Sequence, residues 1–240
     1  MEEKTHWKKT VILFVLSCFM LLMVGVLFFG VGKFLVSDVG EPALAEDNTQ
    51  YTVVIDAGHG GIDGGATVNG IFEKDINLSV SKKVKEFLHL YDVNVVLTRN
   101  TDTLLCDENS KHKKRDDLYN RMKVAKSVNT PIFLSIHMNK FSEEKYKGLQ
   151  VFFSPNNNDS EALSLLIQQN VREYLQSDND RQAKKATSSI YLLDRLTCPA
   201  VIVECGFLSN SEDLKNLTDE KYQNVLAFVI ANSIIEFINI

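Results

Sequence analysis

The chain has 240 residues and 45% of them are hydrophobic, which suffices for one substantial core and leaves length for a tail or an anchor. Its formal net charge of −5 argues against nucleic acid or another polyanion as a partner held by electrostatic attraction. Cys106, Cys198 and Cys205 lie beyond the N-terminal region, and this odd number argues against a disulfide framework.

An uncharged, almost wholly apolar run occupies residues 11–32. Its length of about 22 residues is enough to cross a hydrocarbon core of roughly 30 Å. Lysines precede the run, which predicts a cytoplasmic N-terminus and export of the remainder. We therefore interpret residues 1–36 as a cytoplasmic tail and transmembrane anchor. The alternative is a signal cleaved near Ala43-Leu44-Ala45, but the apolar run is longer than the roughly 7–15 residues of an ordinary signal peptide.

Residues 37–50 contain Gly40, Pro42 and several acidic residues, and we interpret them as a linker. The remaining residues, 51–240, show no internal repeat and no low-complexity tract, so we expect them to form a single domain.

Within this domain, short runs of β-branched and apolar residues predict strands, and longer stretches with apolar residues at helical spacing predict helices. We expect strands at 51–56, 93–98, 131–136, 149–153, 190–193 and 200–204. We expect helices at 73–90 and around 118–128, 163–175 and 225–234, and an exposed, strongly charged loop at 107–117. This alternation predicts an α/β fold, in which one catalytic domain has a central, mostly parallel (mixed) sheet flanked by helices and is preceded by the transmembrane helix.

Three of the predicted strands are followed or ended by a residue that can bind a metal ion or move a proton. The first runs into the glycine-rich turn around His59, the third into His137, and the last ends on Glu204. Because ligands of parallel sheets bind at the carboxyl ends of the strands, we expect these side chains to meet at one edge. Glu73 opens the first helix at the same edge.

A hydrolytic zinc site has three protein ligands and one open position, and the set of His59, Glu73 and His137 fits this pattern. Glu204 would then serve as the general base. Taken singly, Glu73 is better explained as a partner of the helix dipole, and His137 as a hydrogen-bonded structural residue. The coincidence of all four residues favours the metal site. A dinucleotide loop is disfavoured, because the glycines of residues 58–65 depart from the required spacing and no helix starts within the loop.

The motifs that carry these residues occur in a familiar order: Val54-Ile55-Asp56-Ala57-Gly58-His59-Gly60-Gly61, Glu73-Lys74-Asp75-Ile76-Asn77-Leu78, Leu97-Thr98-Arg99, Ser135-Ile136-His137-Met138-Asn139 and Val203-Glu204-Cys205-Gly206-Phe207-Leu208-Ser209-Asn210. The sequence resembles the zinc-dependent N-acetylmuramoyl-L-alanine amidases over nearly all of residues 51–238. The resemblance implies cleavage of the amide between the lactyl group of N-acetylmuramic acid and L-alanine in peptidoglycan.

Carried over to this sequence, the resemblance implies that His59, Glu73 and His137 bind Zn²⁺ and that Glu204 is the catalytic glutamate. It also implies that Arg121 lies near the substrate groove, with a helix-surface ion pair as the alternative. Asn139 is also expected to line the site. Asp194 stands where the family suggests a basic residue, a departure from the family pattern at that position.

One apolar segment followed by one catalytic domain, with no wall-binding repeats, resembles the layout of the germination-specific, CwlD-type amidases of spore formers. This resemblance implies action on spore cortex, where cleavage prepares muramic-δ-lactam formation needed for germination. It also implies a membrane-anchored or secreted protein whose catalytic domain is extracytoplasmic, in the forespore intermembrane space. The sequence leaves open whether an accessory protein assists the enzyme.

Two other functions compete with this interpretation. A zinc peptidase would cleave within the stem peptide, whereas the amidase frees intact stem peptides with an L-alanine N-terminus. A non-catalytic peptidoglycan-binding domain would need no general base, so Glu204 beside three ligands argues against it.

Overall fold

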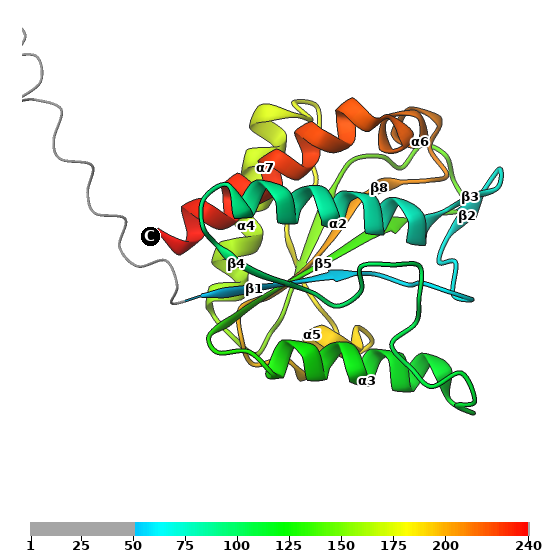
Figure 1. Cartoon of the computed structure of the whole chain (residues 1–240). Helices are drawn as coiled ribbons and strands as arrows, with labels where there is room; N and C mark the ends of the chain where they lie inside the picture. Colours follow the sequence, from blue (N-terminus) through cyan, green and yellow to red (C-terminus); the bar gives the residue numbers. More distant parts are fainter. Residues whose placement is uncertain (1–50, 240) are drawn as a thin grey trace, which may run out of the picture. The chain divides into compact units, whose positions relative to one another are not determined.

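The computed structural model describes residues 51–239, which belong to one compact unit. Its elements in chain order are β1 (Thr52–Ala57), β2 (Thr67–Val68), β3 (Ile71–Phe72), α2 (Glu73–His89), β4 (Asn94–Leu97), α3 (Lys113–Lys126), β5 (Pro131–Asn139), β6 (Gln150–Phe153), α4 (Asp159–Tyr174), β7 (Lys184–Lys185), α5 (Tyr191–Arg195), β8 (Ala200–Phe207), α6 (Ser211–Thr218) and α7 (Glu220–Ile238) (Figure 1).

The central sheet has six strands in the order β4-β1-β5-β8-β6-β7. The four strands β4, β1, β5 and β8 pair in parallel, and β6 joins β8 in the antiparallel sense. The predicted α/β fold with a mostly parallel, mixed sheet is therefore confirmed.

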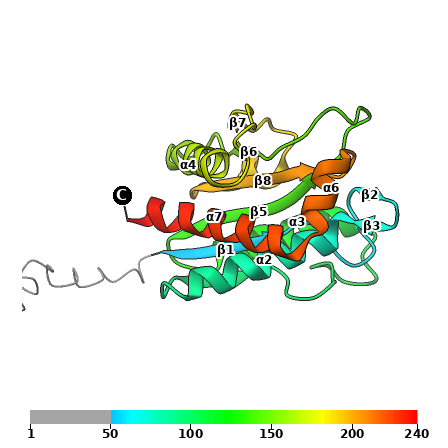
Figure 2. The same ribbon diagram turned by 90° about the horizontal axis from the view of Figure 1, so that it is seen from above.

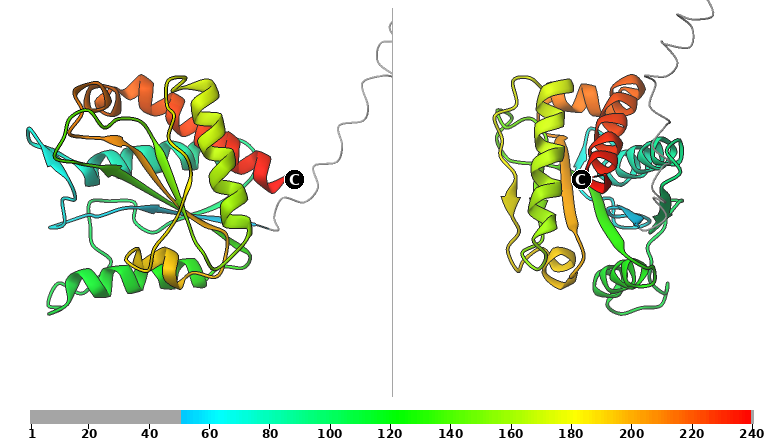
Figure 3. Two further views of the ribbon diagram at one scale, coloured as in Figure 1. Left: turned by 180° about the vertical axis from the view of Figure 1, so that it is seen from behind. Right: turned by 90° about the vertical axis from the view of Figure 1, so that its left-hand side faces the viewer.

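Helices cover both faces of the sheet. Figure 2 shows α7 lying between α2 and α4 on one face, and Figure 3 shows α3 and α5 on the other. Alternate residues of β1 enter different cores: Val53 and Ile55 pack with the α2, α4 and α7 layer, while Val54 packs with the α3 and α5 layer. All three are fully buried, which explains why β1 is a continuous apolar run.

Some predicted elements differ from the structure in their type, their ends or the face that they expose. Residues 191–193 form the start of helix α5, with Ile190 as its N-cap, and no strand, because a run of four apolar residues is equally compatible with a short buried helix. The expected loop at 107–117 ends earlier than predicted, since α3 begins at Lys113. On α7 the exposed face includes Val225 and Phe228, whereas Leu226, Ala227 and Ile230 pack into the core.

Several short elements were not predicted at all, namely β2, β3, β7 and α6. Strands β2 and β3 form a hairpin whose two-residue turn is Asn69-Gly70, both with positive φ. Helix α6 is capped by the side chain of Asn210, which accepts hydrogen bonds from the backbone N–H groups of Glu212 and Asp213.

None of the helices within residues 51–239 combines the length and the apolar character needed to cross a membrane. The transmembrane anchor expected at residues 1–36 and the linker expected at 37–50 lie outside the described residues.

Candidate metal and catalytic site

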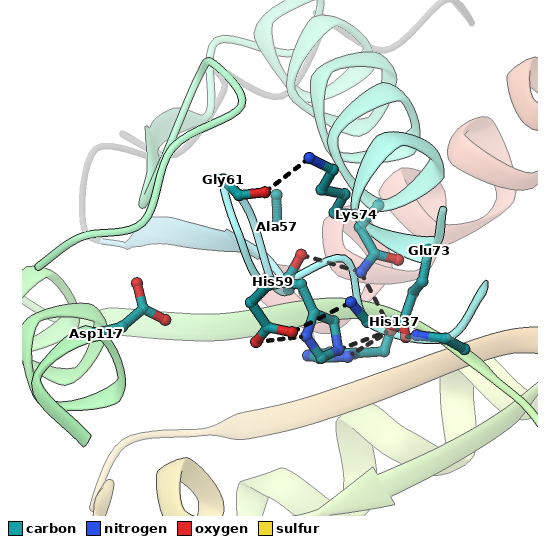
Figure 4. Close-up of polar contacts among 12 residues, drawn as sticks. Ala57, His59, Gly61, Glu73, Lys74, Asp117 and His137 are labelled. Carbon is teal, nitrogen blue, oxygen red and sulfur yellow. Dashed lines mark hydrogen bonds and ion pairs between the residues drawn. The ribbon is translucent and has the colours of Figure 1, made fainter. Parts of the chain in front are cut away.

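The sheet brings the sequence-predicted residues to one edge. His59 follows β1 after a single glycine, His137 lies near the end of β5, and Glu204 lies on β8 directly beside His137 in the parallel register. Glu73 is the first residue of α2, and its carboxylate points toward both histidine rings (Figure 4). The three residues expected to bind a metal ion each offer one donor atom, and these atoms lie within 4.8 Å of one another.

His59 sits in an unusual backbone conformation. Its φ of 60° is in the left-handed region, which costs a non-glycine residue free energy and occurs where the surrounding structure enforces it. The Nε2 atom lies 3.3 Å from Oε1 of Glu73, and Nδ1 lies 2.9 Å from Oδ2 of Asp63. Burial on its own lowers the pKa of His59, but the carboxylates of Glu73 and Asp63 outweigh it and raise the pKa.

Glu73 is 3% exposed and is held on both oxygens. Its Oε1 lies 2.9 Å from Nδ1 of His137 and accepts a 3.1 Å hydrogen bond from the backbone N–H of Met138, while its Oε2 accepts one of 2.8 Å from the N–H of Ala66. Burial would raise the pKa of this carboxyl, but His137 and His59 hold it well below the usual range. The group is therefore an anion ready to bind a cation.

Two glycines make room for the ligand side chains. A Cβ at Gly58 would lie 2.3 Å from the ring of His137, and a Cβ at Gly65 would lie 2.5 Å from Oε2 of Glu73. Gly65 also has φ +66°. The glycine-rich loop thus permits both the backbone path and the close approach of two ligands.

The loop that carries His59 is also tied to α2. Lys74 donates a 2.8 Å hydrogen bond to the carbonyl of Gly61 (Figure 4). It also pairs with Asp102 at 2.6 Å. Asp102 in turn accepts a 2.7 Å hydrogen bond from the N–H of Gly61.

The chemistry of this donor set fits a divalent metal ion. Two imidazoles and one carboxylate, converging from three separate elements, are the donors of many hydrolytic zinc sites. A cavity of about 290 Å³ opens beside His59 and His137 and is lined also by Glu204, so a ligand position on the cavity side stays accessible to water and substrate.

Glu204 has a different environment from Glu73. Its Oε2 atom is buried and has no hydrogen-bond partner among the residues that the structure describes. Burial raises the pKa of this carboxyl, the nearby His137 opposes that effect, and Glu73 adds to it. A buried carboxylate that lines a cavity and keeps one oxygen without a partner is unfavourable for stability and suited to proton transfer.

Arg121 is among the residues that line the cavity beside His59 and His137, and its role toward the substrate stays a prediction. Its side chain is 1% exposed, and its guanidinium pairs with Asp56 and Asp117 at 2.7 Å each. It also donates to the carbonyls of Ala57 at 2.8 Å and His59 at 2.7 Å. With its N–H groups engaged inside the protein, Arg121 supports the backbone of the His59 turn. The pair with Asp117 lies within one helix but is buried, so it is not the surface ion pair considered as an alternative.

Asn139 ends β5 beyond His137, but it is not among the residues that line the cavity. Its Oδ1 accepts a 2.8 Å hydrogen bond from the N–H of Lys140, which turns the side chain back on its own chain. Asp194 pairs with the adjacent Arg195 at 3.1 Å. The cavity wall on this side is instead provided by Tyr191 and Leu192 of α5.

Sequence reasoning missed one charged neighbour of the site. Asp63 lies within the glycine-rich loop and contacts the ring nitrogen of His59 that faces away from Glu73. A carboxylate on the second nitrogen of a metal-binding histidine orients the ring and increases its basicity. Its spacing of four residues from His59 was the only signal in the sequence, and such a spacing is weak by itself.

Comparisons with known proteins agree with this geometry. Residues 53–236 match the N-acetylmuramoyl-L-alanine amidase family. The germination-specific N-acetylmuramoyl-L-alanine amidase of Bacillus subtilis is 33% identical over 188 residues, which cover 77% of this chain and 78% of that protein.

Solved structures show the same similarity. The CwlD amidase from Clostridioides difficile, solved in complex with the GerS lipoprotein, superposes with a TM-score of 0.74 at 37% identity, over 78% of this chain and 98% of that one. The amidase AmiC2 of Nostoc punctiforme gives a TM-score of 0.69 at 30% identity, over 80% and 98% of the two chains. The fold, the match over residues 53–236 and these relatives together show that the chain belongs to the N-acetylmuramoyl-L-alanine amidase family.

Proposed function

We propose that this amidase is a zinc enzyme in which His59, Glu73 and His137 hold the metal ion and Glu204 is the general base. The observation that supports this most strongly is the convergence of three donor atoms within 4.8 Å beside a cavity lined by Glu204. The substrate is peptidoglycan, and the bond cleaved joins the lactyl carbonyl of N-acetylmuramic acid to the amine of L-alanine.

A bound zinc ion supplies Lewis-acid chemistry, since it makes water more acidic and polarises a carbonyl oxygen. The residues of the chain do the rest. Glu204 accepts the proton of the attacking water as the new C–O bond forms. It then delivers that proton to the alanine nitrogen as the C–N bond breaks, which leaves a carboxylic acid on the glycan and a free amine on the stem peptide.

The environment of Glu204 supports this role. Its raised pKa makes it a stronger base than an ordinary glutamate once it is ionised, and its unpartnered Oε2 is free to take the proton. A carboxylate oxygen of Asp63 lies 2.9 Å from the second nitrogen of His59, where its charge would keep the ring oriented through the reaction.

We further propose that the enzyme acts on spore cortex and prepares muramic-δ-lactam formation. This rests on two relatives, the germination-specific amidase of Bacillus subtilis and the CwlD amidase of Clostridioides difficile. The second of these was solved with a lipoprotein, which supports an accessory lipoprotein for this chain as well. The catalytic domain would then lie outside the cytoplasm, in the forespore intermembrane space, with residues 1–36 as the anchor and 37–50 as the linker.

The test uses the purified full-length chain, solubilised in a mild detergent and incubated with peptidoglycan. New L-alanine amino termini are counted with added zinc and with a chelator. Zinc-dependent release of stem peptides that begin with L-alanine is the expected result. Release of peptides cut within the stem would establish the alternative zinc peptidase. Zinc binding and peptidoglycan binding without any cleavage would favour the non-catalytic binding domain.

A further inference from the structure

Arg99 has no role in the chemistry proposed above, yet its side chain is 4% exposed and lies next to the metal-binding residues. It follows the edge strand β4, at the end of the Leu97-Thr98-Arg99 motif. Its guanidinium donates four hydrogen bonds, and every acceptor is a backbone carbonyl. These acceptors are Ala57 at 2.8 Å, Gly58 at 2.9 Å, Lys74 at 2.8 Å and Thr101 at 3.0 Å.

Three of these carbonyls flank the candidate metal ligands. Ala57 and Gly58 come directly before His59, and Lys74 comes directly after Glu73. A single planar group therefore joins the turn that carries one ligand to the first helical turn that carries another. We propose that Arg99 is a positioning residue that sets the separation of His59 and Glu73, and with it the affinity of the site for its metal ion. This inference rests on the proposed function.

The local electrostatics show that this arrangement has a cost. Arg99 and Arg121 approach the carbonyl of Ala57 together, each at 2.8 Å. Burial and the neighbouring charge of Arg121 lower the pKa of Arg99, while Asp102, Asp56 and Asp117 oppose that effect. The repulsion between two buried guanidinium groups at one carbonyl is unfavourable for stability. In return, the two groups fix the backbone geometry of the His59 turn.

The contacts also explain why the residue is an arginine. A guanidinium carries five N–H donors in a fixed fork, which reaches acceptors in several directions at once. A lysine ammonium keeps the charge but concentrates its donors at one point. In Arg99 the Nη2 atom alone donates to both Gly58 and Lys74, while Nε and Nη1 hold Ala57 and Thr101. A lysine cannot make all four bonds from its one nitrogen, so the support that the two ligands share is weakened. The close packing of the fork is visible at Gly60, where a Cβ would lie 3.1 Å from Arg99.

The experiment compares Arg99→Lys with Arg172→Lys in the full-length chain. Arg172 is a matched control, because its half-buried guanidinium also binds backbone carbonyls, those of Asn179 and Arg181 at 2.8 Å each, and these do not flank a ligand. The zinc dissociation constant is measured by competition with a chromophoric chelator. The thermal midpoint of the metal-free form is measured alongside.

Arg99→Lys is expected to weaken zinc binding by about tenfold or more, as removal of supporting hydrogen bonds around a metal site does. Arg172→Lys is expected to bind zinc as the unaltered chain does. The visible absorption of cobalt-loaded protein should change in Arg99→Lys alone, because it reports ligand geometry. Arg99→Gln is measured as well, so that one folded variant of Arg99 is available if the other is unstable.

An unchanged zinc affinity and cobalt spectrum in either folded Arg99 variant would overturn the positioning role and leave the proposed function intact. Failure of the unaltered chain to bind zinc would overturn the proposed function, and the role of Arg99 with it. The two failures are therefore distinguishable.

Discussion

Replacing Gly58 by alanine tests the site at its most crowded point. The added Cβ would lie 2.3 Å from the imidazole of His137, whereas ordinary contact begins near 3.4 Å. The ring must therefore withdraw by about 1 Å, since Gly58 is fixed at the end of β1 and its N–H is bonded to the carbonyl of Ile136 at 3.1 Å. A displacement of about 1 Å in a catalytic group costs on the order of 100-fold in rate.

The assay follows zinc content, zinc affinity and release of L-alanine amino termini for Gly58→Ala. We expect turnover to fall by about 100-fold and zinc binding to weaken, because the displaced ring is a ligand. Gly64→Ala is the matched control in the same loop. Its Cβ would lie 2.9 Å from the ring of Phe72, which is 40% exposed and free to move aside. Wild-type zinc affinity and turnover in Gly58→Ala would refute the placement of His137 in the site.

Three other predictions concern buried carboxyl groups. Glu204→Gln should lower kcat by at least about 100-fold while zinc content stays unchanged, and near-normal turnover would exclude it as the base. Asp56→Ala should lower the free energy of unfolding by about 3 kcal/mol in urea titrations, because it breaks a fully buried pair with Arg121. Burial raises the pKa of Asp213, so its folded form holds a proton more tightly than its unfolded form. The stability of the unaltered chain relative to Asp213→Asn should therefore fall as pH rises through that raised pKa, which unfolding at about pH 4 and about pH 7 would show. An equal difference in the free energy of unfolding between the two proteins at both pH values would contradict this prediction.

The strand-end histidines and Glu204 were predictable because a buried parallel strand is a continuous apolar run, and a polar residue at its end is conspicuous. Glu73 was predictable as the start of an amphipathic helix on the same edge. The backbone conformation of His59 and the contact with Asp63 were not, since both depend on how the loop folds back on itself. Arg121 shows most clearly what the sequence does not reveal. Its sequence neighbours give no sign that Asp56, 65 positions away, accepts a hydrogen bond from its guanidinium.

Two of the missed elements did have local signals. Asn69-Gly70 is a strong hairpin turn sequence, and Asn210 followed by acidic residues is a typical helix start. Residues 190–193 had no such signal. Four apolar residues followed by a charged pair are compatible with either a strand or a helical turn, and packing of α5 against α3 decides the outcome.

The direction of β1 has a practical consequence. The described chain enters the domain at the amino end of β1, and α7 ends near the same point, while His59 follows the carboxyl end of the strand (Figure 1). Six residues at about 3.3 Å each place roughly 20 Å of strand between the entry point and the first ligand. Fusion partners or surface linkages attached directly at residue 51 or residue 239 would therefore hold the domain on the side opposite the site. An immobilised enzyme of this kind would present its cleft outward, toward an insoluble polymer that cannot diffuse to it.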